Sequence, residues 1–383
     1  MGIVSPIGNG LAATVDSLRG GRPGIGPVTS FDVSQSRSKT AGLVKDLREP
    51  KNRREARWHR ASLMMAAALE ELREADGAFV PEACVIGTTS GGMTFGEDFF
   101  RGRKTGNGSD RDAQWIANYP PQKAVLDTLD LAKWNVPVEI IANACASGTN
   151  AVGRAMSMIR HGLCRRVLCG GYDVISELVF MGFDCLQAST DELCRPFDKD
   201  RTGLVLGEGA ALLALENRDD AMARGADIVC EISGYGISTD NHHLTQPHPS
   251  GIGPRMAMER ALAVAGREAA AVDYVNAHGT ATVFNDGSEG AAITELCPGV
   301  AVSSTKALTG HTLGAAGAIE AVFCGLAIRE GFLPPNGNFR EADPAWQMDI
   351  VANVSREKAL RCVLSNSFGF GGTNASIVME AVA

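Results

Sequence analysis

The chain has 383 residues, which is long enough for two or three domains or for one large duplicated unit. Hydrophobic residues make up 45% of it and charged residues 21%, a composition typical of a globular protein with a sizeable core. The formal net charge of −8 argues against nucleic acid or an anionic membrane surface as the main partner.

The ten cysteines are scattered without a CxxC pair, mostly inside apolar runs. This pattern favours reduced, buried thiols over a disulfide framework or a zinc site. No apolar run reaches the roughly 18 residues that a membrane span needs, and no basic leader with an apolar core stands at the start. We therefore expect a cytoplasmic protein without a membrane span or a metal.

The first elements in chain order are a short helix over residues 11–18 and a long helix over residues 50–77. In the long helix, Arg53, Arg57 and Arg60 have the spacing of residues on one helix face. Two interpretations are open for this basic cluster: a solvated helix face, or a docking site for an acidic partner.

A buried strand is predicted over residues 138–142, followed by a turn of small residues and a helix that starts near Gly148. Cys145 stands at the apex of this turn. The free N–H groups of the following helix favour a thiolate there, and the thiolate is the nucleophilic form. The alternative is a small cysteine packed between two elements.

The second half of the chain repeats the pattern of the first. A strand, a small-residue turn and a Gly/Ala-rich helix occur around Cys145 and again around Lys306. Each is followed by a Gly-rich loop and an apolar strand that ends in glutamate, at Glu216 and at Glu380. We infer a duplicated α/β unit with halves 1–216 and 217–383, packed so that strand ends of both halves converge on one site.

Four polar groups lie at such strand ends: Cys145, His278, Lys306 and His311. A thiol with two imidazoles suits chemistry in which sulfur takes an acyl group and the histidines act on a second carbonyl. The glycine-rich loop over residues 368–372, FGFGG, has backbone N–H groups that can stabilise an oxyanion.

Around these residues the sequence resembles the elongating type of β-ketoacyl-acyl-carrier-protein synthases. The resemblance rests on NACASGTNAVG, VNAHGTATVFND, SSTKALTGHTLGAAGAIEA and SNSFGFGGTNAS, with RPFDKDRTGLVLGEGA as a fifth block, and it covers nearly the whole chain. It implies an α/β thiolase fold, the duplicated five-layered α-β-α-β-α architecture, and an acyltransferase of fatty acid or related biosynthesis. Family members are typically homodimers, and a heterodimer is the other assembly considered.

The resemblance also implies a role for each matching residue. Cys145 would accept the acyl chain, while His278 and His311 would bind the thioester carbonyl of malonyl-carrier protein as carbon dioxide leaves. The N–H groups of Cys145 and Phe370 would form an oxyanion hole, and the Phe370 side chain would also be the gate. Lys306 and its partner Glu320 would support the site. Thr280 and Thr282 would bind the phosphopantetheine arm of the carrier protein. No metal or redox cofactor is implied, and the basic cluster Arg53, Arg57 and Arg60 becomes an expected dock for acyl carrier protein.

Three departures from the family pattern bear on function. The first strand expected before the Gly-Ile-Val-Ser turn is missing from the N-terminal half, which indicates a late start site or a truncated record. Val283 and Phe284 replace the usual Pro-Leu pair beside the pantetheine tunnel. Ser90 falls near the position where a bulky residue limits the acyl pocket, so a longer chain is expected to fit.

One functional alternative is of a different class: a non-elongating partner subunit that shapes the pocket of a paired ketosynthase. Such a subunit would lack the nucleophile, and Cys145 argues against it. The second histidine favours elongation, since chain-initiating relatives carry asparagine where His311 stands. The sequence leaves open whether the pathway makes a fatty acid, a polyketide or an aryl polyene.

Overall fold

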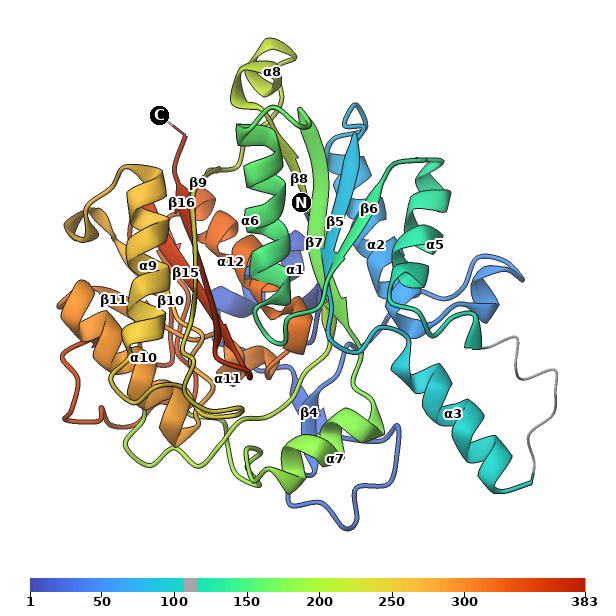
Figure 1. The fold of residues 1–383 in the computed structure, drawn as a ribbon, viewed down its shortest axis with the longest axis horizontal. Helices are drawn as coiled ribbons and strands as arrows, with labels where there is room; N and C mark the ends of the chain where they lie inside the picture. The colour runs from blue at the N-terminus through green and yellow to red at the C-terminus, as the bar shows by residue number, and fades with distance from the viewer. Residues whose placement is uncertain (107–115, 383) are drawn as a thin grey trace.

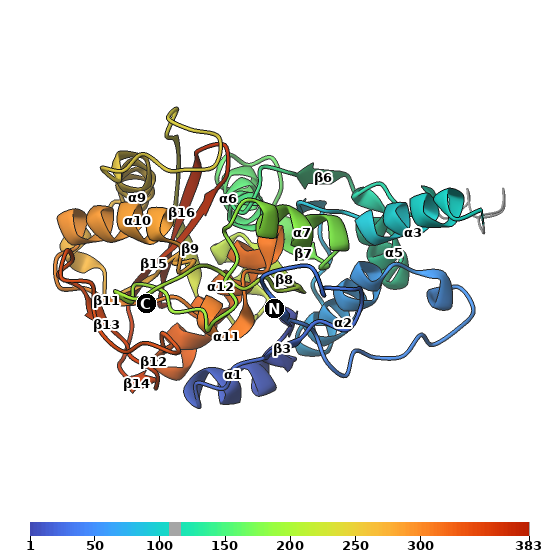
Figure 2. The same ribbon diagram turned by 90° about the horizontal axis from the view of Figure 1, so that it is seen from below.

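The computed structural model describes residues 1–106 and 116–382, and it folds into five alternating layers of helices and sheets (Figure 1). Two six-stranded sheets lie on either side of a central pair of helices, and further helices cover the outer faces of both sheets (Figures 1 and 2). This confirms the α-β-α-β-α architecture expected of the thiolase fold.

The first sheet is built from the N-terminal part of the chain. Its strands, in spatial order, are β2 (Gly8–Asn9), β1 (Gly2–Ser5), β8 (Gly209–Glu216), β7 (Arg166–Asp173), β5 (Ala83–Gly87) and β6 (Val138–Ile141). Strands β6, β5 and β7 are parallel, whereas β8 runs antiparallel to both β7 and β1. Both faces are covered, which explains the continuous apolar runs of β5 and β8.

The second sheet has a similar arrangement, built from strands of the C-terminal part that follow one another from its parallel edge. They are β13 (Asp349–Ile350), β11 (Ala301–Ser303), β10 (Tyr274–Asn276), β15 (Cys362–Gly369), β16 (Thr373–Glu380) and β9 (Glu231–Thr239). Again three parallel strands, β11, β10 and β15, are followed by two antiparallel pairings, β15 with β16 and β16 with β9. The shared order and strand directions confirm the duplication inferred from the sequence; the exact boundary after Glu216 stays a prediction.

The central layer consists of α6 (Ser147–Arg160) and α12 (Ala316–Glu330), which pack against each other and against both sheets. Their glycines allow close approach: a Cβ on Gly148 would lie 2.7 Å from the Ala318 nitrogen, and one on Gly317 would lie 2.0 Å from the Thr149 hydroxyl. Because α12 is enclosed on all sides, its residues 316–328 are all buried.

The outer layers and connections contain the other elements. They are α2 (Arg60–Ala75) and α5 (Gln122–Ala132) on the first sheet, α9 (Ile252–Ala265) and α10 (Val283–Leu296) on the second, and the connecting elements α1 (Leu11–Arg19), α3 (Met93–Lys104), α7 (Glu177–Cys185), α8 (Arg218–Ala223), α11 (Lys306–Thr309), β3 (Ile25–Pro27), β4 (Thr40–Gly42), β12 (Phe332–Leu333) and β14 (Arg356–Glu357). Among the described residues, no helix is both long and apolar enough to cross a membrane. All ten cysteines are free thiols, seven of them buried, as the sequence predicted.

The Gly-Ile-Val-Ser stretch, interpreted above as a turn, is strand β1, whereas the absence of a strand before it stays a prediction. β1 pairs with β8 from Gly2 to Val4. Gly2 also lets α2 pack closely on β1, because a Cβ there would lie 1.9 Å from the Ala68 carbonyl oxygen of α2. β1 is shorter than its counterpart β9, which pairs along all of β16. Residues 213–216 of β8 instead border a cavity of about 590 Å³.

The single long helix predicted over residues 50–77 is also wrong, because the chain is folded into a loop before α2 begins. The buried carboxylate of Glu55 accepts hydrogen bonds from the Lys51 N–H and the Arg48 guanidinium, and a 3₁₀ turn follows at Glu55–Arg57. His59 then caps α2, its ring nitrogen accepting from the Ala61 N–H at 3.1 Å.

Strand β7 contains two consecutive glycines in its middle. The strand continues through Gly170 and Gly171 to Asp173. The glycines serve close contact rather than a turn, since a Cβ on Gly170 would lie 2.0 Å from the Ala211 carbonyl oxygen of β8. The extension carries Asp173 to the end of the sheet that faces the candidate site.

Candidate active site

Cys145 lies in a tight turn between β6 and α6, as the sequence predicted. Ala144 before it has φ = 55°, an uncommon conformation for a residue with a side chain. The Ser147 side chain stabilises the turn by accepting from the Asn143 N–H at 3.0 Å and donating to the Ala144 carbonyl at 2.6 Å. Strain of this kind persists where the surrounding structure fixes it, and it is common at functional sites.

Cys145 is 7% exposed and lines a cavity. Burial raises its pKa to about 12, while Lys306 and the backbone N–H groups of Cys145 and Phe370 act in the opposite direction. The resting thiol is therefore protonated, which corrects the expectation that the helix start would make it a thiolate. The two N–H groups that lower the pKa are the pair expected to form the oxyanion hole.

His278 and His311 come from the C-terminal half and lie beside Cys145 in the same cavity. Their ring centroids are 5.2 Å apart, with the planes nearly perpendicular at 85°. His278 follows β10, whereas the backbone of His311 is fixed by its N–H to Val205 at 2.7 Å and its carbonyl to Gly207 at 2.8 Å. The strand ends of the two halves thus meet as predicted.

Both imidazoles are buried, and their pKa values lie well below 6.5. Burial is the largest cause for each, followed by the positive charge of Lys306. Each histidine also has an Nδ1 atom that is buried without a hydrogen-bond partner among the described residues. The neutral rings are therefore able to bind a substrate oxygen without a competing charge.

Two acidic residues that the sequence analysis did not identify hold the His278 loop. Glu289 of α10 accepts from the N–H groups of His278 and Gly279, each at 2.8 Å, and from the Asn366 amide at 3.2 Å. Asp286 accepts from the Thr280 N–H at 2.9 Å. Burial raises the pKa of Glu289 to about 7, against the effect of these donors. The available signal was the pair of acidic residues three apart at the start of a helix.

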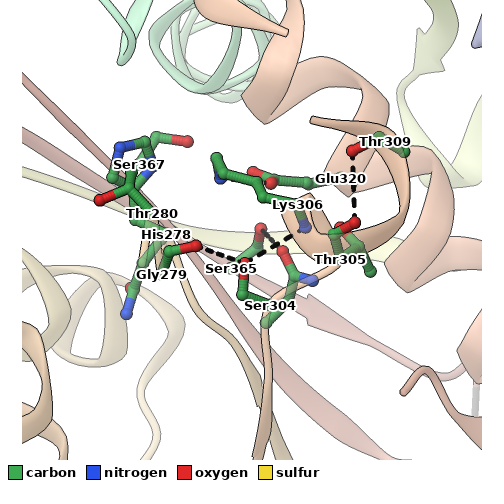
Figure 3. A network of polar contacts seen from close by, with 12 residues as sticks. His278, Gly279, Thr280, Ser304, Thr305, Lys306, Thr309, Glu320, Ser365 and Ser367 are labelled. Atoms are coloured by element: carbon green, nitrogen blue, oxygen red, sulfur yellow. Dashed lines mark hydrogen bonds and ion pairs between the residues drawn. The ribbon is translucent and has the colours of Figure 1, made fainter. Parts of the chain in front are cut away.

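Lys306 and Glu320 form a buried ion pair of 2.5 Å, with side-chain exposures of 1% and 3%. Figure 3 shows the two side chains alongside each other, with His278 and Gly279 nearby. The Ser304 hydroxyl donates to the Gly279 carbonyl at 2.6 Å and accepts from the Lys306 N–H at 3.3 Å, so it joins the Lys306 turn to the histidine loop (Figure 3). The expected partnership of Lys306 and Glu320 is present.

The cavity has a volume of about 220 Å³ and connects Cys145 with the surface. Thr280 and Thr282 line it, their hydroxyls 2.9 Å apart. Val283 and Phe284 also line it and are 59% and 58% exposed, so the departure from the family pattern lies at the cavity mouth. The cavity is therefore lined both by the buried Cys145 and by residues exposed at the surface.

Phe370 lies in the tight loop between β15 and β16. Its ring stacks on Phe183 of α7, with centroids 5.5 Å apart and planes inclined by 22°. Two other N–H groups of the loop are already bonded, that of Gly371 to Leu244 and that of Gly372 to Gly369. The loop therefore leaves the Phe370 N–H for the Cys145 sulfur, and the two phenylalanines border the cavity.

Two sets of predicted residues are not gathered at this cavity. The Ser90 hydroxyl donates to Asp173 at 2.6 Å, and Ser90 is not among the residues that line the cavity. In the basic cluster, Arg53 and Arg57 are exposed and precede α2, while Arg60 is paired with buried Glu208 at 2.6 Å. The three arginines therefore do not share one helix face, which corrects that prediction.

The described residues contain no cluster of three or more His, Cys, Asp or Glu side chains arranged to hold a metal ion. A duplicated five-layered fold with a buried cysteine of one half beside two buried histidines of the other is that of a condensing enzyme. The comparisons with known proteins make this class specific.

Residues 133–221 match the N-terminal domain model of β-ketoacyl synthases, and residues 229–340 match the C-terminal domain model. The 3-oxoacyl-[acyl-carrier-protein] synthase 2 of Synechocystis sp. is 36% identical over 408 residues, covering 99% of the chain and 96% of the relative. The chain belongs to the β-ketoacyl synthase family, and it is an acyltransferase of the ketosynthase type.

Two solved structures extend the comparison. The ishigamide ketosynthase/chain length factor is 33% identical, with a TM-score of 0.93 over 100% of this chain and 98% of that one. AntDE:AntF, a type II polyketide acyl-carrier protein in complex with its ketosynthase, is 25% identical, with a TM-score of 0.89 and the same coverage. Ketosynthases of both fatty acid and polyketide type therefore resemble this chain.

We expect the condensation rate to show no break near pH 6.5. Because burial and Lys306 hold the pKa values of His278 and His311 well below 6.5, both rings stay neutral as the pH falls through that value. The measurement is kcat for malonyl consumption from about pH 5.5 to 8, with the folded fraction followed in parallel. A fall in kcat centred on pH 6.5 in fully folded enzyme would contradict neutral histidines.

Proposed function

We propose that Cys145, His278 and His311 carry out a decarboxylative Claisen condensation on acyl and malonyl groups delivered by an acyl carrier protein. The observation that carries the proposal is the meeting of the Cys145 thiol and both neutral imidazoles in one cavity, which Thr280 and Thr282 also line.

In the first step, the Cys145 sulfur attacks the thioester carbonyl of the acyl-carrier protein. The N–H groups of Cys145 and Phe370 stabilise the oxyanion, to which one donor contributes about 2.7–4 kcal/mol in related chemistry. The Cys145 thiol loses its proton as the new bond to carbon forms, and the leaving carrier thiolate takes up a proton in its place. The acyl group remains on Cys145, and the carrier protein is free to exchange.

In the second step, the malonyl group on the phosphopantetheine arm of its carrier protein enters the cavity. His278 and His311 hydrogen-bond to its thioester oxygen, which becomes an enolate oxygen as carbon dioxide leaves. The enolate carbon attacks the acyl-Cys145 carbonyl, the Cys145 thiolate departs, and the product is β-ketoacyl-carrier protein. Thr280 and Thr282 hold the phosphopantetheine arm, which the carrier protein brings, and Lys306 with Glu320 supports the site.

The second candidate is a non-elongating partner subunit of a heterodimeric ketosynthase. It is favoured by the resemblance to the ishigamide ketosynthase/chain length factor. The nucleophile and both histidines argue for the condensing role instead. The homodimer remains our proposed assembly, with a heterodimer as the alternative.

The test is a malonyl-dependent condensation assay with purified wild-type protein and a panel of acyl primers of different lengths. Production of β-ketoacyl-carrier protein, together with an acyl mass increment on the peptide containing Cys145, supports the proposal. Tight binding of carrier protein without acylation or condensation would assign the chain to the partner-subunit class. The primer that is elongated fastest identifies the pathway.

The carrier protein must also dock on the surface of the enzyme, and Arg53 and Arg57 are the candidate docking residues. Both are exposed, and the structure shows no carboxylate paired with either side chain among the described residues. Arg60 is less suited to docking because Glu208 and the Val44 carbonyl already bind its guanidinium.

We expect Arg53→Glu/Arg57→Glu to raise KM for an acidic carrier protein about 5- to 10-fold at low salt, with kcat unchanged and a smaller effect at high salt. The matched control is Arg361→Glu, another exposed arginine, just before β15 and so at the end opposite Gly369. Equal KM values for the double variant and the control would refute docking at this loop.

A further inference from the structure

A buried carboxylate outside the residues assigned above lies at the end of β7. Asp173 is 0% exposed and, within the part of the chain that the structure describes, has no lysine or arginine as an ion-pair partner. Its two oxygens instead accept hydrogen bonds from six donors on two separate segments. A charge buried in this way is maintained by the geometry of its donors.

The first segment is the loop after β5. Thr88, Thr89 and Ser90 each donate a side-chain hydroxyl to Asp173, at 2.8, 2.7 and 2.6 Å. The N–H groups of Thr89 and Ser90 donate as well, at 3.0 and 2.9 Å. Five donors from three consecutive residues fix this loop firmly around the carboxylate.

The second segment comes from the other half of the molecule. The Gly314 N–H donates to Asp173 Oδ2 at 2.6 Å, and a Cβ on Gly314 would lie only 2.7 Å from the same oxygen. Gly314 follows His311 by three residues, and Leu313 between them has φ = 55°. A non-glycine residue in this conformation is strained and needs restraint on both sides.

Those restraints are visible. On the His311 side, the backbone is fixed by Val205 and Gly207. On the Gly314 side, Asp173 is the side-chain acceptor that binds the turn. The strained turn that carries His311 is therefore held at one end by the loop of residues 205–207 and at the other by a carboxylate anchored in the first sheet.

We propose that Asp173 is a positioning residue for the condensation step, which fixes His311 by binding Gly314 and is itself oriented by the loop of Thr88 to Ser90. The inference rests on the proposed function of His311. Asp173 does not line the cavity, and its charge acts on Cys145 by raising the pKa of the thiol, so its effect on His311 passes through the backbone of the His311 turn.

The test is Asp173→Asn. The carboxamide has one acceptor oxygen, and its NH₂ group cannot accept a hydrogen bond from a backbone N–H group, so the N–H groups of either Gly314 or the Thr88 loop lose an acceptor. We expect kcat for condensation to fall about 10- to 100-fold, because a misplacement of about 1 Å at a reacting centre costs that much. Acylation of Cys145 and KM for malonyl-carrier protein stay within about threefold of wild type.

The matched control is Asp127→Asn. Asp127 is another buried carboxylate, bound to the Ser62 hydroxyl and to Lys123 in the outer helical layer. We expect this variant to lower Tm without separating the two half-reactions. If Asp173→Asn instead reduces acylation and condensation by the same factor, or if it reduces neither rate, Asp173 is only a structural residue and the proposal is overturned.

Should Asp173→Asn fail to fold, Thr89→Val decides, because it removes one hydroxyl donor from the oxygen that binds Gly314 at little change in volume. A fall in condensation of about threefold or more with unchanged acylation supports the proposal, and equal rates overturn it. A wild-type enzyme that does not condense at all would refute the proposed function itself, which keeps the two failures distinct.

Discussion

Cys145→Ala is expected to abolish primer-dependent condensation, with a loss on the order of 10⁴-fold or more, because no other group of the site can accept the acyl chain. The alanine leaves His278, His311 and the Phe370 N–H in place. We therefore expect slow decarboxylation of malonyl-carrier protein to persist. The measurements are β-ketoacyl product for the first reaction and carbon dioxide release for the second.

Cys84→Ala is the matched control, since Cys84 is another fully buried thiol, on β5 of the first sheet. Its condensation rate should remain close to that of wild type once the folded fraction is corrected for. An alanine variant at Cys145 that elongates primers at the wild-type rate would show that the acyl chain does not pass through this sulfur.

The duplicated architecture could be predicted because the same local sequence patterns occur in both halves of the chain. Apolar runs, small-residue turns and the terminal glutamates Glu216 and Glu380 recur at similar spacing, and the structure places them in equivalent strands β8 and β16. The convergence of Cys145 and His311 followed from this symmetry, because the ends of equivalent strands face a common interface.

The errors arose where long-range contacts override local preference. Residues 50–77 have a helical pattern, but the Glu55 carboxylate binds preceding N–H and guanidinium groups and holds that stretch as a loop. In a local window the glycines of β7 suggest the end of a strand, although in the structure they allow close contact with β8. Neither the partner of Glu55 nor the spacing of two strands is visible in a local window.

The same reasoning explains which site residues were missed. Asp173 has no distinctive local context, since it accepts hydrogen bonds from loops distant in sequence. Asp286 and Glu289 have only their spacing at the start of α10 as a local signal, and the groups that they bind are not visible in it. The thiol pKa was misjudged for a related reason. The helix start is a local feature that favours thiolate, whereas burial, which dominates at Cys145, is a property of the assembled fold.

The buried ion pair of Lys306 and Glu320 has two effects that can be measured separately, one on stability and one on the pKa values of the site. Between themselves, the two groups compensate each other's desolvation. Toward the site, the ammonium lowers the pKa values of Cys145, His278 and His311. A pair retained only for stability would be replaceable by apolar residues, whereas a pair that keeps the histidines neutral would not.

Lys306→Met is therefore expected to lower the free energy of unfolding by about 3–5 kcal/mol, because it leaves the Glu320 carboxylate buried without its partner. Lys306→Met/Glu320→Leu should recover most of that stability, to within about 1 kcal/mol of wild type, since the apolar pair has no charge to desolvate. Denaturant unfolding measures both values.

Condensation should remain impaired in both variants, and its loss toward low pH should begin at a higher pH than in wild type. The sign follows from the removed charge: Lys306 lowers the histidine pKa values, so its loss raises them toward 6.5, and the rings become protonated sooner as the pH falls. A double variant that regains both stability and the wild-type pH profile would reduce Lys306 to a structural residue.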